Sequence, residues 1–415
     1  MKIRSITYFM DVKRPLDVEA LRRAGEFISG ARAAFEAAGY EVQTVRLASR
    51  PFPYLLPVFE AQAAIELAVE LERAGSEYGF DYVSLGPALP ETPACYGLVP
   101  EMLAATQNVF VAGIMTTQRG ISLEAVRACA EIIHKSAVIS GDGFANLRFA
   151  ALANVPPGAP FFPAAYHDGE VPCFALATEA ADLAVEAFSQ ADSLHGARQA
   201  LIGAIERNAE RLSKTARGLA KQFEALFSGI DFTLAPFPQE AQSLGAAMER
   251  LGVPAVGLHG SLAAAAILTD TLERATFPRA GFNGLMLPVL EDAVLARRAA
   301  EGSLSVKDLL LYSTVCGTGL DTVPLPGDTT AEAIHALLLD LAALSQRLNK
   351  PLTARLMPIP GKKAGDPTGF DFAYFANSRV LPLHAGTLGG FLDRRENIDL
   401  SGSLTASRTG AFSHE

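Results

Sequence analysis

The sequence contains no tryptophan, and it has few cysteines and few charged residues for its length. Its four cysteines, Cys95, Cys129, Cys173 and Cys316, stand far apart and form no Cys-x-x-Cys pair. This spacing argues against a disulfide framework and a structural zinc site, and we predict no metal site. Charged residues make up 19% of the chain and hydrophobic residues 49%, so apolar surface is available to offset the entropy of ordering it. The composition predicts a globular protein.

Long apolar runs are missing as well. The longest, at 262–268 and 341–344, are far shorter than the roughly 20 residues that a helix needs to cross a bilayer. Residues 1–9 mix polar and apolar side chains as a strand does, and no export signal is visible there. We therefore expect a cytoplasmic protein without a membrane partner.

Positive charge is scarce and scattered. The formal net charge is -10 at pH 7, and no basic cluster stands out that could release counterions from a nucleic acid. We expect no nucleic-acid partner. The cofactor stays unknown, because residues 360–363 lack the pattern of a phosphate-binding loop and residues 317–319 lack that of a dinucleotide fingerprint.

Short strand-like runs alternate with helical patterns through the first half of the chain, a rhythm typical of parallel βα units. The expected strands are 2–9, 41–47, 82–85, 109–114 and 147–153, and the expected helices are 18–38, 61–74 and 123–137. Residues 178–227 are predicted to be almost entirely helical, with Ser193 as an N-cap. Further strands are expected at 232–235 and 352–358, among helices at 262–274, 290–300, 306–312 and 331–348.

These patterns predict an α/β fold. We expect one large unit over residues 1–393, with a candidate lobe boundary near 155–178, where the Pro-rich run 155–160 must be irregular. Residues 394–415 are predicted to be a polar C-terminal tail.

Residues 313–329 are predicted to form a Gly/Pro-rich loop that carries reactive groups. Cys316 is a candidate catalytic nucleophile or proton donor, and Asp321 is a candidate general acid or base. The substrate contacts expected in this loop are Gly317, Gly319, Asp328 and Thr329. The alternative is structural: Cys316 is a small buried residue, while Asp328 and Thr329 cap the helix that starts near Thr330.

Residues 353–366 leave a strand and present three cations near two glycines. Arg355, which can bind a carboxylate in a bidentate way, is predicted to hold an anionic substrate together with Lys362 and Lys363. Alternatively, this segment is a solvated turn that carries ordinary surface lysines.

Residues 154–167 combine prolines and aromatic residues with His167. Because the unperturbed pKa of histidine lies near neutrality, His167 is a third candidate catalytic residue, as a general acid or base. A lone histidine beside aromatic residues can instead be a packed residue, with Phe161, Phe162 and Tyr166 in the core or in a pocket wall.

Several segments together resemble the domain-of-unknown-function 711 family, which is related to uncharacterised protein family 0210. The likeness covers nearly the whole chain up to about Pro382, and the piece at 316–329 is its most distinctive part. The matching pieces are FFPAAYH at 161–167, GLMLPVLED at 284–292, CGTGLDTVP at 316–324 with PGDT at 326–329, and PGKKAGD at 360–366.

The resemblance implies the α/β barrel of pyruvate formate-lyase-like glycyl radical enzymes, built from two parallel half-sheets surrounded by helices. Cys316 would then lie on or near the central loop of the barrel. A glycyl radical enzyme should also carry an Arg-Val-x-Gly-aromatic signature near its end, and here only Gly390-Phe391 is similar to it. The sequence therefore gives little support to radical chemistry.

We predict an enzyme that acts on a small anionic carbon metabolite through the catalytic residues and anion contacts named above. The alternative is a barrel that has lost catalysis and binds a metabolite as a sensor or regulator, for which the missing radical signature is the motive. Turnover separates the two, because only the enzyme forms product.

Ala-rich helical patterns leave apolar surface that a second copy of the chain would cover, so we expect a homo-oligomer. Size-exclusion chromatography with light scattering should give at least twice the chain mass of 43.9 kDa. The mass of a single chain would contradict this expectation.

Overall fold

One large sheet organises the structure, a computed structural model that describes residues 1–169 and 171–402. Its strand order is β10-β11-β7-β4-β3-β2-β1-β8-β9. The strands are β1 (Lys2–Phe9), β2 (Val42–Ala48), β3 (Tyr82–Ala88), β4 (Val109–Ile114), β7 (Phe149–Ala153), β8 (Cys173–Glu179), β9 (Leu226–Ala235), β10 (Gly319–Pro326) and β11 (Leu352–Ile359). Strands β1, β2, β3, β4 and β7 run parallel, and the pairs β8–β9 and β10–β11 flank them in the opposite direction.

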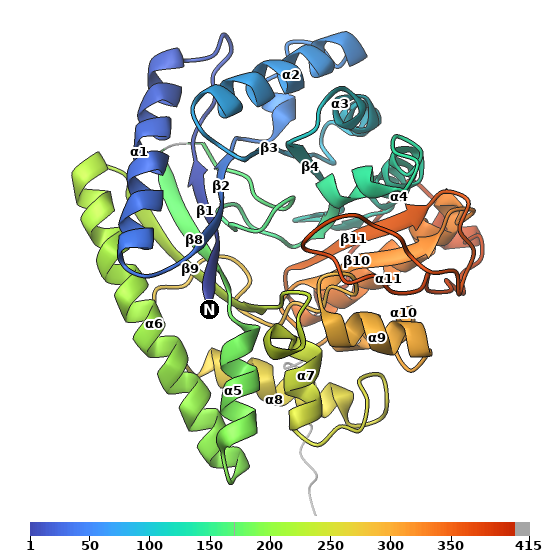
Figure 1. Cartoon of the computed structure of the whole chain (residues 1–415). Coiled ribbons are helices and arrows are strands. Elements are labelled where there is room, and N and C mark those ends of the chain that lie inside the picture. Colours follow the sequence, from blue (N-terminus) through green and yellow to red (C-terminus); the bar gives the residue numbers. More distant parts are fainter. Residues whose placement is uncertain (170, 403–415) are drawn as a thin grey trace, which may run out of the picture.

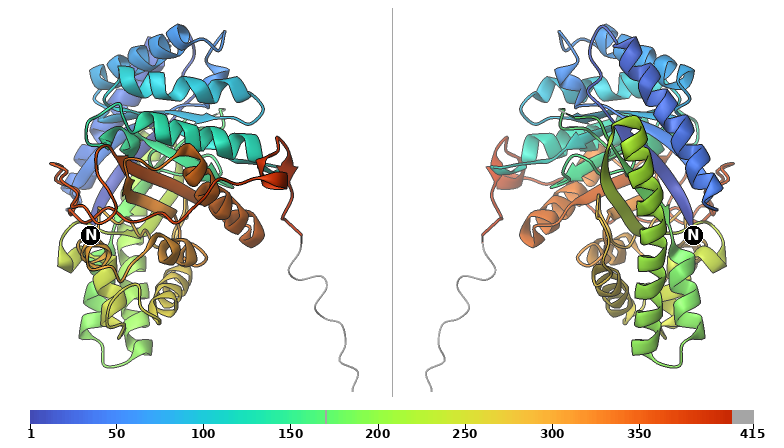
Figure 2. Two further views of the ribbon diagram at one scale, coloured as in Figure 1. Left: turned by 90° about the vertical axis from the view of Figure 1, so that its right-hand side faces the viewer. Right: turned by 90° about the vertical axis from the view of Figure 1, so that its left-hand side faces the viewer.

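Helices surround the outer side of this sheet, whose strands form an arch in Figure 1. They are α1 (Val18–Ala37), α2 (Ala61–Glu77), α3 (Val99–Ala105), α4 (Leu123–Ser136), α5 (Ala181–Gln190), α6 (Leu194–Phe223), α7 (Leu244–Arg250), α8 (Ser261–Glu273), α9 (Ala293–Glu301), α10 (Val306–Tyr312) and α11 (Ala331–Leu348). Asp17 caps α1, and the predicted N-cap Ser193 is confirmed for α6. Figure 2 shows that helices α5 to α8 extend beyond one end of the sheet.

The two faces of the sheet pack against different partners. On the outer face, Ile6 of β1 and Phe27 of α1 belong to the main core, which the strands share with the helices. On the inner face, Phe9 belongs to a smaller cluster with Phe110 and Phe162. Successive side chains of a strand point to opposite faces, so β1 contributes to both clusters.

The Pro-rich segment 155–167 lies against the inner face. The carbonyl oxygen of Pro160 accepts a hydrogen bond from Thr7 Oγ1 at 3.4 Å, and the carbonyl oxygen of Ala165 accepts one from Ser84 Oγ at 2.7 Å. Strand side chains therefore satisfy backbone groups that an irregular buried segment cannot pair by itself. A lobe boundary near 155–178 stays a prediction.

Two strands of the large sheet, β8 and β10, were not expected from the sequence pattern. Residues 178–227 are helical only over α5 and α6, while Thr178 belongs to β8 and 226–227 to β9, so the prediction of an almost entirely helical stretch is wrong at both ends. The predicted loop at 313–329 is also wrong, because it contains β10, whose residues 319–325 are all buried. In the sheet order β10 is an end strand and has a strand partner on one side only. Pro324 is tolerated in such a strand because no ladder N–H is required of it.

A small antiparallel sheet holds the first part of the predicted C-terminal tail. It consists of β5 (Thr116–Thr117), β6 (Gly120–Ser122) and β12 (Asn397–Ile398), in the order β12-β6-β5. Arg347 of α11 also donates to the carbonyl oxygens of Leu400 at 3.0 Å and Gly402 at 2.8 Å. The rest of the predicted tail, 403–415, lies outside the described residues.

The fold is mixed α/β, with a large, mostly parallel sheet surrounded by helices, so the predicted class is confirmed. Among the described residues the named strands do not close into a barrel, since β10 and β9 end the strand order. A short stretch between them forms isolated bridges: Leu285 pairs with Leu234 of β9, and Pro288 pairs with Asp321 of β10. No helix in the described part of the chain is both long and apolar enough to cross a membrane.

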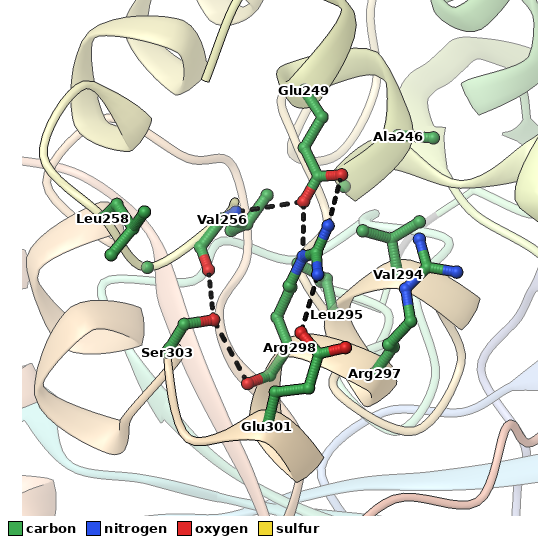
Figure 3. A network of polar contacts seen from close by, with 12 residues as sticks. Ala246, Glu249, Val256, Leu258, Val294, Leu295, Arg297, Arg298, Glu301 and Ser303 are labelled. Carbon is green, nitrogen blue, oxygen red and sulfur yellow. Dashed lines mark hydrogen bonds and ion pairs between the residues drawn. The ribbon is translucent and has the colours of Figure 1, made fainter. Parts of the chain in front are cut away.

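A compact polar network ties α7 to α9 (Figure 3). Arg298 donates from Nε to Glu249 Oε1 at 2.7 Å and from Nη2 to Oε2 at 2.9 Å. Its Nη1 donates to Glu301 at 2.6 Å, and Glu249 also accepts from the backbone N–H of Val256 at 3.1 Å. The Arg298 and Glu249 side chains are 17% and 18% exposed, so this bidentate pair is shielded from most of the solvent.

Replacing Glu249 by Gln should lower the free energy of unfolding by about 2 kcal/mol, because a shielded bidentate pair loses one charge. Urea denaturation followed by circular dichroism measures this loss. The matched control is Arg297→Gln, since Arg297 lies on the same helix but pairs with Glu240 at side-chain exposures of 43% and 60%. The control should lose less than about 0.5 kcal/mol. Equal losses would contradict a stabilising role for the network.

Candidate functional site

A partly open cavity lies on the inner side of the sheet. Its charged lining comes from Arg4 on β1, Arg46 on β2, Glu179 on β8, Arg355 on β11 and Glu291, which precedes α9. Its aromatic lining consists of Tyr82, Phe110, Phe162, Phe237, Phe372 and Tyr374. The cavity therefore combines groups that are far apart in the sequence and that the sheet brings to one place.

A chain of buried ion pairs runs along one wall. Arg355 donates from Nε to Asp321 Oδ1 at 2.5 Å and from Nη2 to Glu291 Oε1 at 2.6 Å. The second oxygen of Glu291 accepts from Arg4 Nη2. Asp321 is 0%, Arg355 4% and Glu291 4% exposed, so these charges persist in the interior because each faces a charge of the opposite sign.

The negative charges of Asp321 and Glu291 in this series of ion pairs are compensated unequally. Burial raises the pKa of Asp321, and the attraction of Arg355 offsets only part of that rise. Burial also pushes the pKa of Glu291 upward, but Arg4 and Arg355 outweigh it and leave that pKa lowered. Oδ2 of Asp321 is buried and has no hydrogen-bond partner among the described residues. Glu291 is thus the carboxylate that stays ionised at the centre of this series of ion pairs.

Arg46 differs from the other two arginines of the cavity. Its Nε donates to Thr44 Oγ1 at 2.9 Å, and within the described part of the chain no carboxylate forms an ion pair with it. Its guanidinium carbon lies 5.1 Å from the ring centroid of Phe162. Burial and the repulsion of Arg4 lower the pKa of Arg46 to about 9, so the group stays charged at neutral pH at a cost that a bound anion would reduce.

Glu179 faces the same cavity from the end of β8 and is 5% exposed. Its Oε2 accepts a hydrogen bond from Gln43 Nε2 at 2.6 Å. Burial raises the pKa of Glu179, although the Gln43 hydrogen bond and the charges of Arg4 and Lys2 lower it in part. The cavity therefore holds a cation without a carboxylate partner and a carboxyl group that binds its proton more tightly than usual.

Two residues predicted from the sequence, Asp321 and Arg355, contact each other, and Arg355 lines the cavity. Cys316 is not in that lining; it lines a separate hollow together with Lys350. The Cys316 Sγ accepts the N–H of Gly319 at 3.3 Å, and burial raises the pKa of its thiol. This setting disfavours a thiolate, and the catalytic role of Cys316 stays a prediction.

His167 also lies outside the cavity lining. Its backbone N–H donates to the carbonyl oxygen of Ser49 at 2.9 Å, and its Nδ1 is 3.5 Å from Asp168 Oδ1. The residue is 3% exposed, and burial lowers the pKa of its ring. These contacts fit a packed, neutral histidine, so its acid–base role stays a prediction.

The other charged contacts predicted from the sequence lie on two turns, after β11 and before α11, outside the cavity lining. Lys363 and Asp328 are exposed, Lys362 is half-buried and Thr329 is buried. The cap of α11 is the side chain of Thr330, which accepts from the N–H of Ala333, so the expectation that Asp328 and Thr329 cap this helix is wrong. Their roles in substrate binding stay predictions.

Gly317 and Gly319, two of the predicted substrate contacts, are needed for close backbone packing. A Cβ on Gly317 would lie 2.6 Å from the Cα of Gly284. Gly319 has a φ of +99°, and a Cβ there would lie 2.4 Å from the carbonyl oxygen of Thr353. Both positions let the 316–319 turn lie directly against neighbouring backbone.

Sequence reasoning missed Arg4, Arg46, Glu179 and Glu291. A signal was present for the first two, because each interrupts a predicted strand of an α/β core, where charged side chains are rare unless they are paired or functional. Glu291 lies in the segment 284–292 that carries part of the family resemblance. Glu179 was hidden because the predicted helical stretch 178–227 includes the end of its strand.

Fold and site together define an α/β protein whose curved, mostly parallel sheet carries a cavity lined by arginines, glutamates and aromatic rings. A family model described as Uncharacterised ACR (DUF711) matches residues 1–374, and the chain belongs to this family. UPF0210 proteins of Pyrobaculum aerophilum and Pyrobaculum arsenaticum are 33% and 35% identical to it, over 79% of this chain and 76% of each relative. A UPF0210 protein of Acetivibrio thermocellus is 29% identical over the same shares. The family resemblance of the sequence is confirmed.

Replacing Arg355 by Met should lower the free energy of unfolding by about 3 kcal/mol, because Asp321 and Glu291 then face each other without their shared cation. In this variant the buried Asp321 keeps a pKa above its unfolded value, so the folded state binds more protons and the loss should shrink as the pH falls. Urea denaturation in mildly acidic and mildly alkaline buffers measures both effects. The control is Arg355→Met combined with Asp321→Asn, which should recover part of the loss at high pH. A loss independent of pH would contradict this account.

Proposed function

We propose that this protein binds a small organic anion in the cavity and that Arg46 holds it. The observation that carries the proposal is the difference between the three arginines: carboxylates engage Arg4 and Arg355, whereas in the described part of the chain Arg46 has no such partner. A guanidinium offers a planar pair of donors that fits a carboxylate or phosphate. Desolvation by the surrounding protein strengthens such a contact.

The other residues of the cavity lining indicate which kind of molecule carries the anionic group. Six aromatic rings line the cavity, and Phe162 also stacks near the Arg46 guanidinium. Ligand sites commonly combine apolar walls with a few placed polar groups. We therefore propose a carboxylate with a carbon skeleton, rather than an inorganic ion, as the preferred ligand.

We further propose that the protein is an enzyme acting on this anion. Support comes from Glu179, a buried carboxyl group with a raised pKa in the same cavity as a charged arginine, since such perturbed groups concentrate at active sites. Asp321 and Arg355 keep a part in this proposal as positioning residues that hold Glu291 and Arg4 in place. Cys316 and His167 lie outside the cavity lining and have no role in it.

The barrel of pyruvate formate-lyase-like enzymes is our proposal for the architecture. In support, β11 and β1 stand five steps apart in the strand order, or roughly 24 Å in a flat sheet at about 4.8 Å per step. Yet Glu291 contacts both Arg355 of β11 and Arg4 of β1, so the sheet must curl. The stretch that bridges to β9 and β10 would then be the last strand of the ring.

The test of the binding site is Arg46→Met, which keeps most of the side-chain volume and removes the charge. Thermal shift against a panel of small carboxylates and phosphates should yield at least one ligand of the wild-type protein, and at about 100 times its Kd it should stabilise by about 2.7 kcal/mol. The variant should lose this stabilisation. The control is Arg22→Met on the exposed face of α1, whose side chain is 48% exposed, and it should keep the full shift.

Two results would overturn the proposal. One is a ligand whose stabilisation survives in Arg46→Met, because the anion would then be held elsewhere. The other is a panel without any ligand. A ligand that binds but is never converted would leave the anion site in place and replace the enzyme by a metabolite-binding regulator.

A further inference from the structure

The cavity has a second polar feature beyond the anion site, formed by Glu179 and Gln43. Gln43 occupies one oxygen of the carboxyl group, Oε2, at 2.6 Å. For the other oxygen, Oε1, no hydrogen bond is present among the described residues, and the residue lines the cavity. Glu179 can therefore accept a hydrogen bond from a ligand without giving up its contact with Gln43.

We infer that Glu179 selects the ligand: the cavity takes a small carboxylic acid that also carries a hydrogen-bond donor, a hydroxyl or amino group, at its far end. The acid group pairs with Arg46, and the donor binds Oε1 of Glu179. This inference rests on the proposed anion site and adds the class of ligand to it.

The positions of Gln43 and Arg46 along β2 limit the distance between the two ends of the ligand. Gln43, which holds Glu179, and Arg46 both line the cavity and are three residues apart, which corresponds to roughly 10 Å along the backbone of a strand. This length is an upper limit for the two binding groups, because the Nε of Arg46 turns back to Thr44 Oγ1 at 2.9 Å. After allowance for two hydrogen bonds, this limit admits an unbranched acid of up to about six carbons. A dicarboxylic acid fits poorly, because its second carboxylate would face the carboxyl group of Glu179.

The surroundings of Glu179 favour a hydrogen-bond donor at the end of the ligand that faces it. Lys2 and Arg4 on β1 attract a negative Glu179, and Asp182 at the start of α5 repels it. Burial opposes the charged form, and a ligand donor would compensate for the lost water contacts. A ligand without the donor leaves this carboxyl group with Gln43 alone, and sites built to hydrogen-bond a substrate group discriminate strongly against analogues that lack it.

Calorimetry with four probes tests the inference: pentanoate, 5-hydroxypentanoate, 5-aminopentanoate and glutarate. The wild-type protein should bind the hydroxy or amino acid at least about tenfold more tightly than pentanoate, and glutarate more weakly than either. In Glu179→Gln, the preference over pentanoate should fall below about threefold while pentanoate still binds. Asp182→Asn removes a neighbouring carboxylate that is not in the cavity lining, and it should keep the full preference.

The outcomes separate this inference from the proposed function. If pentanoate binds and Arg46→Met abolishes its binding, but the donor brings no preference, the inference is overturned and the anion site stands. If Glu179→Gln loses pentanoate as well, Glu179 supports the structure of the cavity and the inference is overturned. If no acid binds the wild-type protein, the anion site and the inference fall together.

Discussion

The carboxylate of Glu291 connects two strands, β1 and β11, that stand five steps apart in the large sheet. It contacts Arg4 on β1 and Arg355 on β11, and Arg355 continues the chain to Asp321 on β10. These strands lie far apart in the strand order, so the ion pairs form only when the sheet is curled. Burying four charges costs several kcal/mol each, and their mutual attraction has to offset that cost. The same contact fixes the positions of Arg4 and Arg355 beside the cavity.

Charged groups that are fully paired within the protein differ from charged groups that still have a free donor or acceptor facing the cavity. The network of Glu249 and Arg298 uses its polar atoms within the protein, and it joins two helices without leaving a group for a ligand. Arg46 and Glu179 are different, since each has donor or acceptor capacity directed to a cavity. A protein retains such incompletely paired buried groups at a cost to stability, which is why they point to a site.

Much of the secondary structure could be read from local patterns. The bounds expected for β1, β4, α10 and α11 agree with the structure, because each has a clear period of apolar residues or a recognisable start and end. Strands β8 and β10 failed for different reasons. The Ala-rich end of β8 runs into a helix of similar composition, and the prolines of β10 favour a loop unless the strand lies where a ladder N–H is not needed.

The sequence by itself determined the α/β class, most of the helices and strands, and the family, because these follow from patterns that neighbouring residues share. It also singled out Arg355 and Asp321 by the residue types around them. Only the tertiary structure decided which charges are paired, since Arg4, Arg46, Glu179 and Glu291 come from separate parts of the chain. Their proximity depends on strand order and on the curl of the sheet. Pairing, burial and exposure to a cavity are properties of that arrangement, and no local pattern of residues encodes them.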